Sequence, residues 1–241
     1  MLEKQQSVLE HLTELRRRII YSVVALLVTI TGCMFYSHRI FIYFLSTATS
    51  DPKAPLIIVQ NAMADAFMSE FHLAVIAAIV IASPVLIYQL VAFVLPALRE
   101  SEKRLLYMGL PFATGMFLAG WAFGWYIVVP LTKNFFLTLS SSAGIANHIT
   151  PNAYISFILG ICNPLGIAFE LPLVVLILAR IGLVTADFLA RIRKYAFLGI
   201  MVVAAILSPP DVISLTVFFI PLYGLYEFSI IVARLGGKKK E

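Results

Sequence analysis

The basic residues of this chain fall into alternate gaps between its apolar segments. Six long apolar stretches leave seven polar segments, which hold 4, 2, 3, 1, 4, 0 and 4 Lys and Arg residues in chain order. Alternate polar segments therefore hold 15 and 3 of the 18 basic residues. Because cytoplasmic loops of membrane proteins retain Lys and Arg, the richer side is predicted to be cytoplasmic. The pattern predicts an all-α polytopic membrane protein with six transmembrane helices and both termini inside.

Composition supports one integral membrane domain over residues 1–241. The chain is 61% hydrophobic and 13% charged, whereas a soluble domain is about 45–50% apolar and about 25% charged. We attribute the net charge of +5 to topology and contact with anionic membrane lipid, and we expect no nucleic-acid binding. Both cysteines lie in apolar segments, so we expect no disulfide framework, metal site or cofactor.

The apolar stretches are too long for barrel strands, so each is predicted to be a helix. The expected spans are residues 19–37, 71–95, 105–129, 153–179, 195–207 and 212–232. Residues 1–18 show an apolar stripe at helical spacing and are predicted to form a cytoplasmic amphipathic helix that runs into the first span. The fifth span is about 20 Å long against a hydrocarbon core of about 30 Å, so we expect short fifth and sixth helices that thin the bilayer or lean on a partner. Alternatively, the fifth helix begins within residues 187–194.

The predicted outside segments differ in character. The loop over residues 38–70 is rich in apolar residues and is expected to pack as a cap or an interfacial helix. The loop over residues 131–152 contains a Ser-rich stretch and is expected to be partly flexible. The third is a turn, Ser208-Pro209-Pro210-Asp211, in which Asp211 is placed to cap the sixth helix.

Glu170 is the costliest residue in the chain because it stands well inside the fourth span. A carboxylate at membrane depth costs about 2.5–3.5 kcal/mol on insertion scales. Pro164, Gly166 and Pro172 surround it, so a kink and a concave face are expected there. We interpret Glu170 as a polar point in an intramembrane cavity; the alternative is a protonated side chain bonded to a neighbouring helix.

Three further acids have simpler explanations. Glu227 lies near the cytoplasmic end of the sixth span and can snorkel or pair with Arg234. Glu14 and Glu102 lie in basic segments, where ordinary ion pairing explains them; for Glu14 the expected partner is Arg17 or Arg18.

Enzyme signatures for phosphate loops, nucleophile elbows and zinc helices are missing, so an enzyme is not expected.

Several motifs together resemble the TatC family, the receptor subunit of the twin-arginine protein translocase. They are His11-Leu12-Thr13-Glu14-Leu15-Arg16-Arg17-Arg18, Ser83-Pro84-Val85-Leu86-Ile87-Tyr88-Gln89, Ala92-Phe93-Val94-Leu95-Pro96-Ala97-Leu98, Glu102-Lys103-Arg104, Gly166-Ile167-Ala168-Phe169-Glu170-Leu171-Pro172, Ser208-Pro209-Pro210-Asp211-Val212 and Ile220-Pro221-Leu222-Tyr223. Each motif alone is weak, but their order and spacing cover nearly the whole chain. The family's six spans with both termini inside agree with the charge count.

The resemblance implies a function and a set of residues. TatC-like proteins bind Arg-Arg signal peptides and help folded proteins cross the membrane, driven by the proton-motive force. Carried over, Glu14 and Glu102 bind the arginine pair, while Arg16 and Phe93 shape the same patch. Glu170 matches the family's intramembrane acid in the concave face.

The resemblance also implies partners and a location. The fifth and sixth helices, with Asp211 at their turn, match the docking edges for TatA-like and TatB-like single-span proteins. A homo-oligomer within the complex is expected, in the plasma membrane of a prokaryote rather than in a thylakoid. From the residues alone, the alternative is a secondary transporter of a small solute that uses Glu170. A third class, an intramembrane enzyme, lacks a nucleophile–base pair.

Overall fold

The computed structural model describes residues 2–49, 57–60, 62–94, 100–142, 144, 148–180, 182–208 and 211–236. Within these ranges, the side chains of residues 2–11, 47–49, 94, 100–108 and 236 are not described. The Pro96-Ala97-Leu98 part of one motif and the Pro209-Pro210 pair of another therefore lie outside the described residues.

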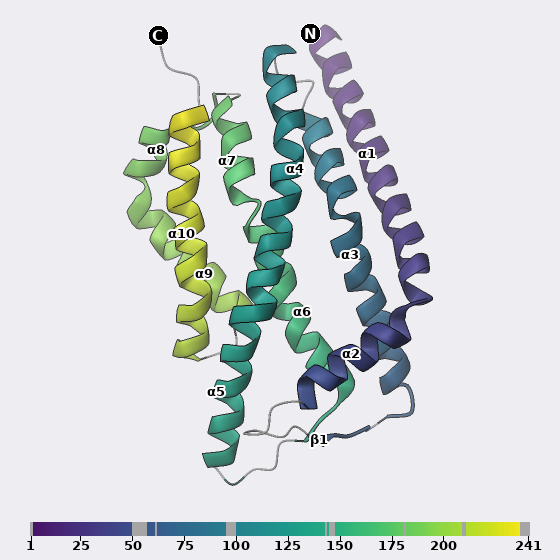
Figure 1. Ribbon diagram of the computed structural model, residues 1–241. Helices are drawn as coiled ribbons and strands as arrows, with labels where there is room; N and C mark the ends of the chain where they lie inside the picture. Colours follow the sequence, from purple (N-terminus) through teal and green to yellow (C-terminus); the bar gives the residue numbers. More distant parts are fainter. Residues whose placement is uncertain are drawn as a thin grey trace.

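Nearly all of the described chain is helical, as the apolar pattern predicts. The elements are α1 (Leu2–Met34), α2 (Ser37–Thr49), β1 (Ile57–Ile58), α3 (Asp65–Val94), α4 (Glu100–Phe123), the π-helical turn η2 (Gly124–Val128), α5 (Val129–Ser142), β2 (His148–Ile149), α6 (Pro151–Ala168), α7 (Leu171–Arg180), α8 (Ala186–Arg191), α9 (Arg193–Leu207) and α10 (Val212–Gly236). The long helices run side by side, and the start of α1 and the end of α10 lie at the same end of the molecule (Figure 1). Five described segments are long and apolar enough to cross a membrane: Leu12–Met34, Asp65–Phe93, Gly109–Ser142, Pro151–Arg180 and Val212–Leu235.

The first and second helices differ slightly from the expected bounds. The amphipathic segment and the first span form one continuous helix, α1, which ends at Met34 rather than at Ser37. The second span begins in helix α3 at Asp65, six residues before the expected 71, because the polar residues before Phe71 continue the helical hydrogen bonding.

The third span extends well past the expected end at residue 129. α4 continues through η2 into α5 as far as Ser142, so residues 131–142 are helical rather than part of a flexible loop. Pro130 has no N–H and would break an ordinary helix. The wider π-helical turn accommodates Pro130. In this turn the Val129 N–H donates to the Gly124 carbonyl, five residues back, instead of to the carbonyl four residues back as in an α-helix.

The fourth span is broken at the position where a kink was expected. α6 ends at Ala168, Phe169 and Glu170 form a turn, and α7 begins at Leu171. Pro172 cannot donate a backbone hydrogen bond to the preceding turn, and its ring crowds the carbonyl four residues back. The fourth span therefore consists of two stacked helices that meet at Glu170.

The last two spans are unequal in length. α9 has 15 residues and begins at Arg193, directly after the short helix α8, so the fifth helix is short and starts within the alternative range of 187–194. α10 has 25 residues, so the expectation of a short sixth helix is wrong. α10 is longer because its helix continues through Arg234, beyond the apolar stretch.

The loop over residues 38–70 contains the helix α2, as the expected interfacial element. α2 lies across the lower ends of the spans, beside α3 (Figure 1). β1 and β2 pair in parallel, with Ile57 opposite His148 and Ile58 opposite Ile149. The pair joins the loops expected over residues 38–70 and 131–152. Two loops that are far apart in sequence are therefore tied together at this end of the molecule.

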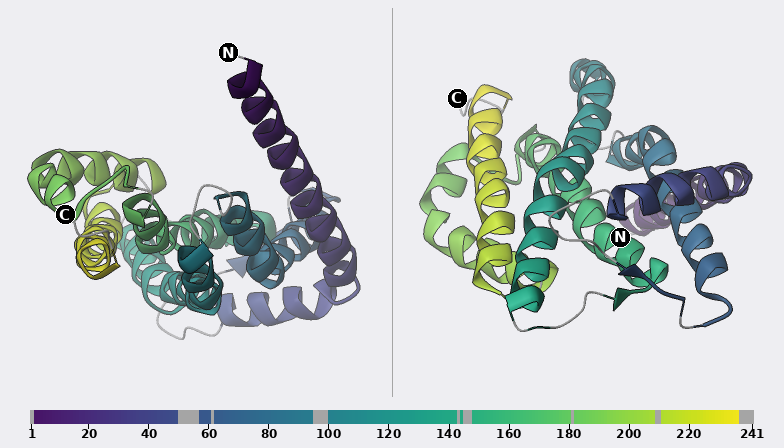
Figure 2. Two further views of the ribbon diagram at one scale, coloured as in Figure 1. Left: turned by 90° about the horizontal axis from the view of Figure 1, so that it is seen from above. Right: turned by 60° about the horizontal axis from the view of Figure 1, so that its bottom comes forward.

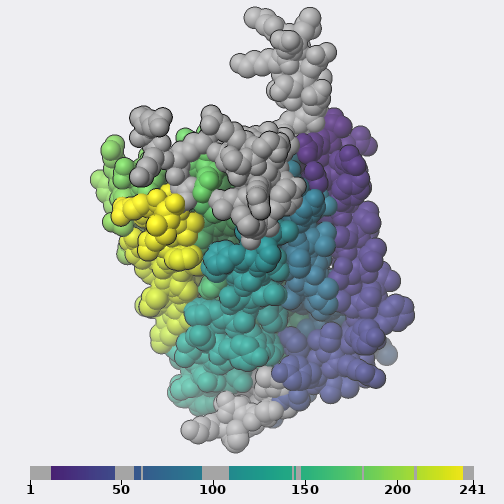
Figure 3. Space-filling model, turned by 45° about the horizontal axis from the view of Figure 1, so that its top comes forward, coloured from purple at the N-terminus to yellow at the C-terminus, as the bar shows by residue number. Residues whose placement is uncertain are grey.

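The helices are arranged in an arc. Seen from above, α1 stands at one end of the arc and α8 with α9 at the other (Figure 2). The main apolar core joins Phe44 of α2, Leu73 of α3, Ile158 of α6 and Phe218 of α10. α1 packs mainly against α3, and it forms one edge of the molecule while α10 lies toward the opposite edge (Figure 3).

Candidate functional site

Glu14 lies on α1 within a small hydrogen-bonded network. Arg18, one helical turn later, places its Nη2 atom 3.2 Å from Glu14 Oε1. The Nη1 atom of Arg18 donates to Gln89 Oε1 of α3 at 3.1 Å. The side chains of Arg18 and Glu14 are only 26% and 29% exposed, although both are charged. The network therefore links α1 to α3 and holds the Glu14 carboxylate at a partly open surface.

The three consecutive arginines of α1 take different directions because successive residues in a helix are about 100° apart. Arg17 donates from Nε to the Tyr21 hydroxyl at 3.0 Å, and its guanidinium lies over that ring at 5.4 Å. Arg16 is exposed. Of the two partners expected for Glu14, the structure therefore selects Arg18 and turns Arg17 away.

Phe93 and Glu102 lie at the same end of the molecule as the first half of α1. Phe93 is partly buried near the end of α3, one turn beyond Gln89, and Glu102 lies in the first turn of α4. The end of α3 and the start of α4 lie at the same end of the molecule as the start of α1 (Figure 1). The backbone therefore brings the predicted patch residues to one end of the molecule, while the Glu102 side chain lies outside the described part.

Glu170 occupies the break between α6 and α7. Its backbone N–H bonds the Ile167 carbonyl at 3.1 Å, and its carbonyl accepts from the Val174 N–H at 3.0 Å. Both carboxylate oxygens are buried and have no hydrogen-bond partner among the described residues. An unpaired buried carboxylate is energetically costly in its charged form.

Near the break at Glu170, α4 and the turn η2 approach α6 closely. A Cβ atom on Gly120 would lie 2.8 Å from the Leu165 carbonyl oxygen and 2.6 Å from the Phe169 ring. A Cβ atom on Gly124 would lie 3.0 Å from the Cys162 Cα atom. Sequence reasoning missed these two glycines, although their spacing of four residues on one helix face is the signal for such an approach.

Asp211 caps α10, as predicted. Its Oδ1 atom accepts the backbone N–H of Ser214 at 2.7 Å. Asp211 Oδ2 and the hydroxyls of Ser208 and Ser214 are buried without a hydrogen-bond partner in the described part of the chain. The turn between α9 and α10 is therefore a polar point at the outer end of an otherwise apolar hairpin.

Glu227 is paired, but not with the expected Arg234. Its Oε2 atom lies 2.8 Å from Arg193 Nη2 of α9, and its Oε1 atom accepts from the Tyr223 hydroxyl at 3.2 Å. Arg234 is two turns away along α10, whereas the start of α9 passes directly beside Glu227. The pair therefore fastens α9 to α10 at the basic end of the hairpin.

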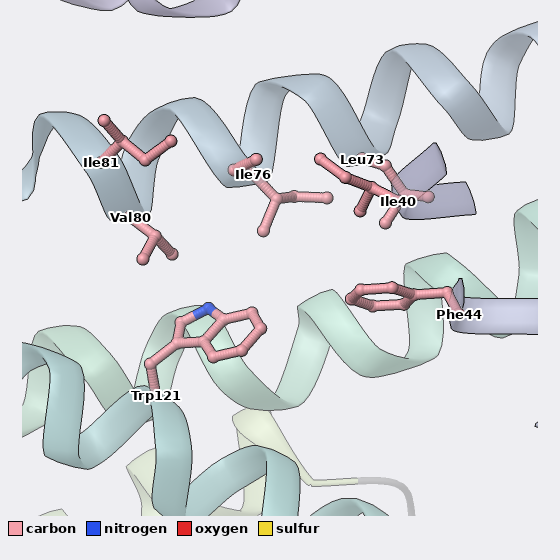
Figure 4. A pocket seen from close by; sticks show the side chains of 8 residues that line it. Ile40, Phe44, Leu73, Ile76, Val80, Ile81 and Trp121 are labelled. Carbon is pink, nitrogen blue, oxygen red and sulfur yellow. The ribbon is translucent and has the colours of Figure 1, made fainter. Parts of the chain in front are cut away.

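A separate apolar pocket of about 190 Å³ lies between α2, α3 and α4. Figure 4 shows Ile76 and Val80 of α3 facing Trp121 of α4, with Ile40 and Phe44 of α2 at one side. The Trp121 indole N–H donates to Asn163 Oδ1 of α6 at 3.3 Å, which fixes the ring that lines the pocket. This pocket is lined by apolar side chains and lies apart from the Glu14 network.

The surface and the charge distribution define the class of protein. Large apolar side chains are exposed along the spans, including Val28 at 69%, Ile206 at 77% and Ile220 at 64%. Soluble monomers rarely expose apolar surface on this scale. The described residues contain no group of three or more His, Cys, Asp or Glu side chains that could hold a metal ion. The chain is thus a polytopic helical membrane protein with the network of Glu14, Arg18 and Gln89 at its basic end.

Comparison with known proteins identifies the family. The family model for the Sec-independent protein translocase protein TatC matches residues 10–221. The protein TatCy of Bacillus subtilis is 34% identical over 241 residues, which cover all of this chain and 94% of the relative. TatC of Helicobacter pylori strain J99 is 37% identical over 225 residues, which cover 93% of this chain and 88% of the relative. The chain belongs to the TatC family.

Solved structures agree with this membership. A crystal structure of the twin-arginine translocase receptor TatC superimposes with a TM-score of 0.82 at 32% identity, covering 94% of this chain and 99% of that chain. A second crystal structure, in the detergent DDM, gives a TM-score of 0.81 at 33% identity, covering 95% of this chain and all of that chain. The helical membrane fold is therefore that of TatC, as the motif resemblance implied, and the protein is a component of a Sec-independent protein translocase.

Proposed function

We propose that this protein is the signal-peptide receptor and scaffold subunit of a twin-arginine translocase, and that it binds Arg-Arg signal peptides of folded cargo. The observation that supports this most directly is the partly exposed Glu14 carboxylate, which Arg18 links to α3 at the end of the molecule where the first turn of α4 carries Glu102. Two acidic residues at this end of the molecule match two guanidinium groups in charge.

The chemistry favours arginine over lysine. A guanidinium group presents a planar fork of N–H donors that fits a carboxylate in a bidentate way, whereas an ammonium group is a point charge. Phe93 adds an aromatic surface beside the patch, against which a guanidinium stem packs favourably. Arg16 is exposed on the same helix as Glu14 and shapes the charge of the patch.

The proposed topology has six spans with both termini in the cytoplasm of a prokaryote. The described basic residues support this, because Arg180 and Arg234 lie in the last turns of α7 and α10, and these helices end at the end of the molecule that holds the start of α1 (Figure 1). Membrane-flanking Lys and Arg are retained on the cytoplasmic side. On this basis α9 is the fifth of the six transmembrane helices, although its 15 residues span only about 22 Å.

The short α9 is the proposed docking edge for single-span TatA-like and TatB-like proteins. A hydrophobic helix shorter than the bilayer thins the lipid around it, and a partner helix relieves that cost. Large apolar side chains of α9, such as Leu198, Val202 and Ile206, are exposed. With Asp211 at its outer turn, the hairpin offers an apolar edge that ends in a polar point. The export step itself would draw on the proton-motive force, and we assign no enzymatic activity.

Crosslinking to a signal peptide tests the proposal. A synthetic peptide with an Arg-Arg pair and a photoreactive group beside that pair is added to membranes that contain the full-length protein. We expect adducts on α1 or on the start of α4, and we expect a Lys-Lys peptide to compete poorly. Adducts confined to α9 and α10, or equal competition by both peptides, would contradict the proposed receptor site.

A further inference from the structure

Arg18 occupies the carboxylate that the proposed function assigns to the peptide. Its Nη2 atom lies 3.2 Å from Glu14 Oε1. A strong charge-assisted N–H to oxygen bond is about 2.7–2.9 Å long, so this contact is a loose, one-pronged one. A guanidinium from a peptide could bind the same carboxylate through two parallel bonds. Arg18 is therefore an internal guanidinium that a peptide arginine can outcompete.

Gln89 gives Arg18 a second acceptor that stays when the first is taken. Gln89 Oε1 accepts from Arg18 Nη1 at 3.1 Å, and it belongs to α3 rather than to the helix that carries Glu14. Arg18 Nε is buried and has no hydrogen-bond partner among the described residues, so the guanidinium is already pressed against the α1–α3 interface. When Glu14 is taken by a peptide, Arg18 can remain at Gln89 without leaving that interface.

We propose that Arg18 is a latch, an internal guanidinium that masks Glu14 until a cationic group of the peptide displaces it, and that Gln89 remains the acceptor of Arg18 when Glu14 is released. This inference rests on the proposed receptor function and adds a competing contact within that site. The contact with Arg18 lowers the affinity of Glu14 for every cationic ligand, so a cation that interacts weakly does not stay bound to Glu14. An Arg-Arg peptide and a Lys-Lys peptide must both displace Arg18 from Glu14. The contact therefore reduces the binding free energy of both peptides by the same amount.

Arg17 offers a matched control on the same helical turn. It carries the same charge as Arg18, but it bonds Tyr21 rather than Glu14. Arg17→Gln therefore removes one positive charge near the patch without unmasking the Glu14 carboxylate. Arg18→Gln removes the same charge and the masking contact together.

The experiment measures peptide binding to the full-length protein in nanodiscs of phosphatidylcholine, a lipid without net charge. Fluorescence anisotropy of a labelled Arg-Arg peptide and a labelled Lys-Lys peptide gives both affinities. We expect Arg18→Gln to raise both affinities by about twofold, the effect of losing one partly exposed ion pair between residues one helical turn apart. Arg17→Gln should raise them by less. An equal rise in peptide affinity for both variants would show that the loss of one positive charge explains the effect. That result would overturn the proposal that Arg18 masks Glu14.

Gln89→Leu tests the role of Gln89 as the acceptor of Arg18. Without Gln89, Arg18 has only Glu14 as its described partner, so the mask tightens and the affinity should fall. In the Arg18→Gln background, Gln89→Leu should have no effect on binding. A fall of the same size in both backgrounds would show that Gln89 supports the site by packing and would overturn its role in the latch.

Glu14→Ala separates failure of the latch from failure of the proposed function. If Glu14→Ala loses binding and Arg18→Gln leaves it unchanged or weakens it, the receptor site stands and Arg18 is an orienting clamp instead. If Glu14→Ala binds like the unaltered protein, the receptor site itself lies elsewhere and both proposals fail. A changed ratio of Arg-Arg to Lys-Lys affinity in Arg18→Gln would mean that Arg18 touches the peptide, which also overturns the mask.

Discussion

Glu14 and Glu170 are both carboxylic acids within segments apolar enough to cross a membrane, but their surroundings are opposite. Glu14 is 29% exposed, ion-paired with Arg18 and connected through it to Gln89. Glu170 has two buried oxygens with no hydrogen-bond partner in the described structure, and it lies in a helix break. The first acid can exchange one partner for another at small cost. The second sits where an unpaired charge is costly.

The contrast separates a binding role from a role inside the membrane. A partly exposed ion pair one turn apart contributes only about 0.3–0.5 kcal/mol to stability, so Glu14 is free to serve recognition. Glu170 destabilises its surroundings unless something else satisfies it. We therefore expect changes at Glu14 to alter binding while the fold survives, and changes at Glu170 to alter transport.

The largest effect is expected at Glu170. Glu170→Leu should insert and fold normally but abolish export, because Leu fills and dries a site that needs a polar group. Glu170→Gln should be milder, because an amide still forms hydrogen bonds. Export of a folded reporter protein, measured beside the membrane level of each variant, checks this. Normal export by Glu170→Leu would remove Glu170 from the mechanism, and degradation of the variant would make it a structural residue.

The next effect is expected at the receptor acids. Glu14→Ala and Glu102→Ala should each weaken binding of an Arg-Arg peptide by roughly tenfold or more, since a hydrogen bond to a charged group contributes about 1.5–3 kcal/mol. Thermal stability in detergent should barely change for Glu14→Ala. Unchanged affinity in both variants would break the comparison, because neither acid would then be a binding residue.

Packing beside Glu170 gives the third prediction. Gly120→Ala should lower thermal stability by the equivalent of about 1–3 kcal/mol, because its methyl group would press on the Leu165 backbone oxygen. Gly115→Ala, on the same helix with nothing within 4 Å of its Cβ position, is the matched control. We expect the control to be neutral or slightly stabilising. Equal stability of both variants would show that α4 and α6 can move apart freely.

The smallest effect sharpens the point about exposed ion pairs. Arg193→Ala removes the pair with Glu227, whose side chains are 49% and 33% exposed, and should cost under about 1 kcal/mol. Tyr226→Phe removes a buried hydrogen bond to the Leu189 carbonyl at 2.7 Å and leaves that acceptor unsatisfied, at a cost of about 1–3 kcal/mol. Thermal unfolding in detergent ranks the two. A larger loss for Arg193→Ala would contradict the view that such pairs contribute little.

The sequence by itself determined the class of fold, because apolar length and the placement of Lys and Arg are properties of the chain alone. The same reasoning located the break around Pro172, the short fifth helix and the cap at Asp211, since each depends on neighbouring residues. It also carried the family resemblance through motifs such as those around Glu14 and Glu170. These signals are local, and local chemistry is enough to produce them.

Only the tertiary structure decided which groups meet. The choice of Arg18 over Arg17 for Glu14, the link to Gln89 and the pairing of Glu227 with Arg193 all depend on how one helix is rotated against another. The extension of α5 to Ser142 was missed because Pro130 looks like a helix end, while the π-helical turn that accommodates it has no simple sequence rule. The close approach at Gly120 likewise exists only because α6 lies against α4. Contacts between helices arise from packing over long sequence separations, which no local pattern specifies.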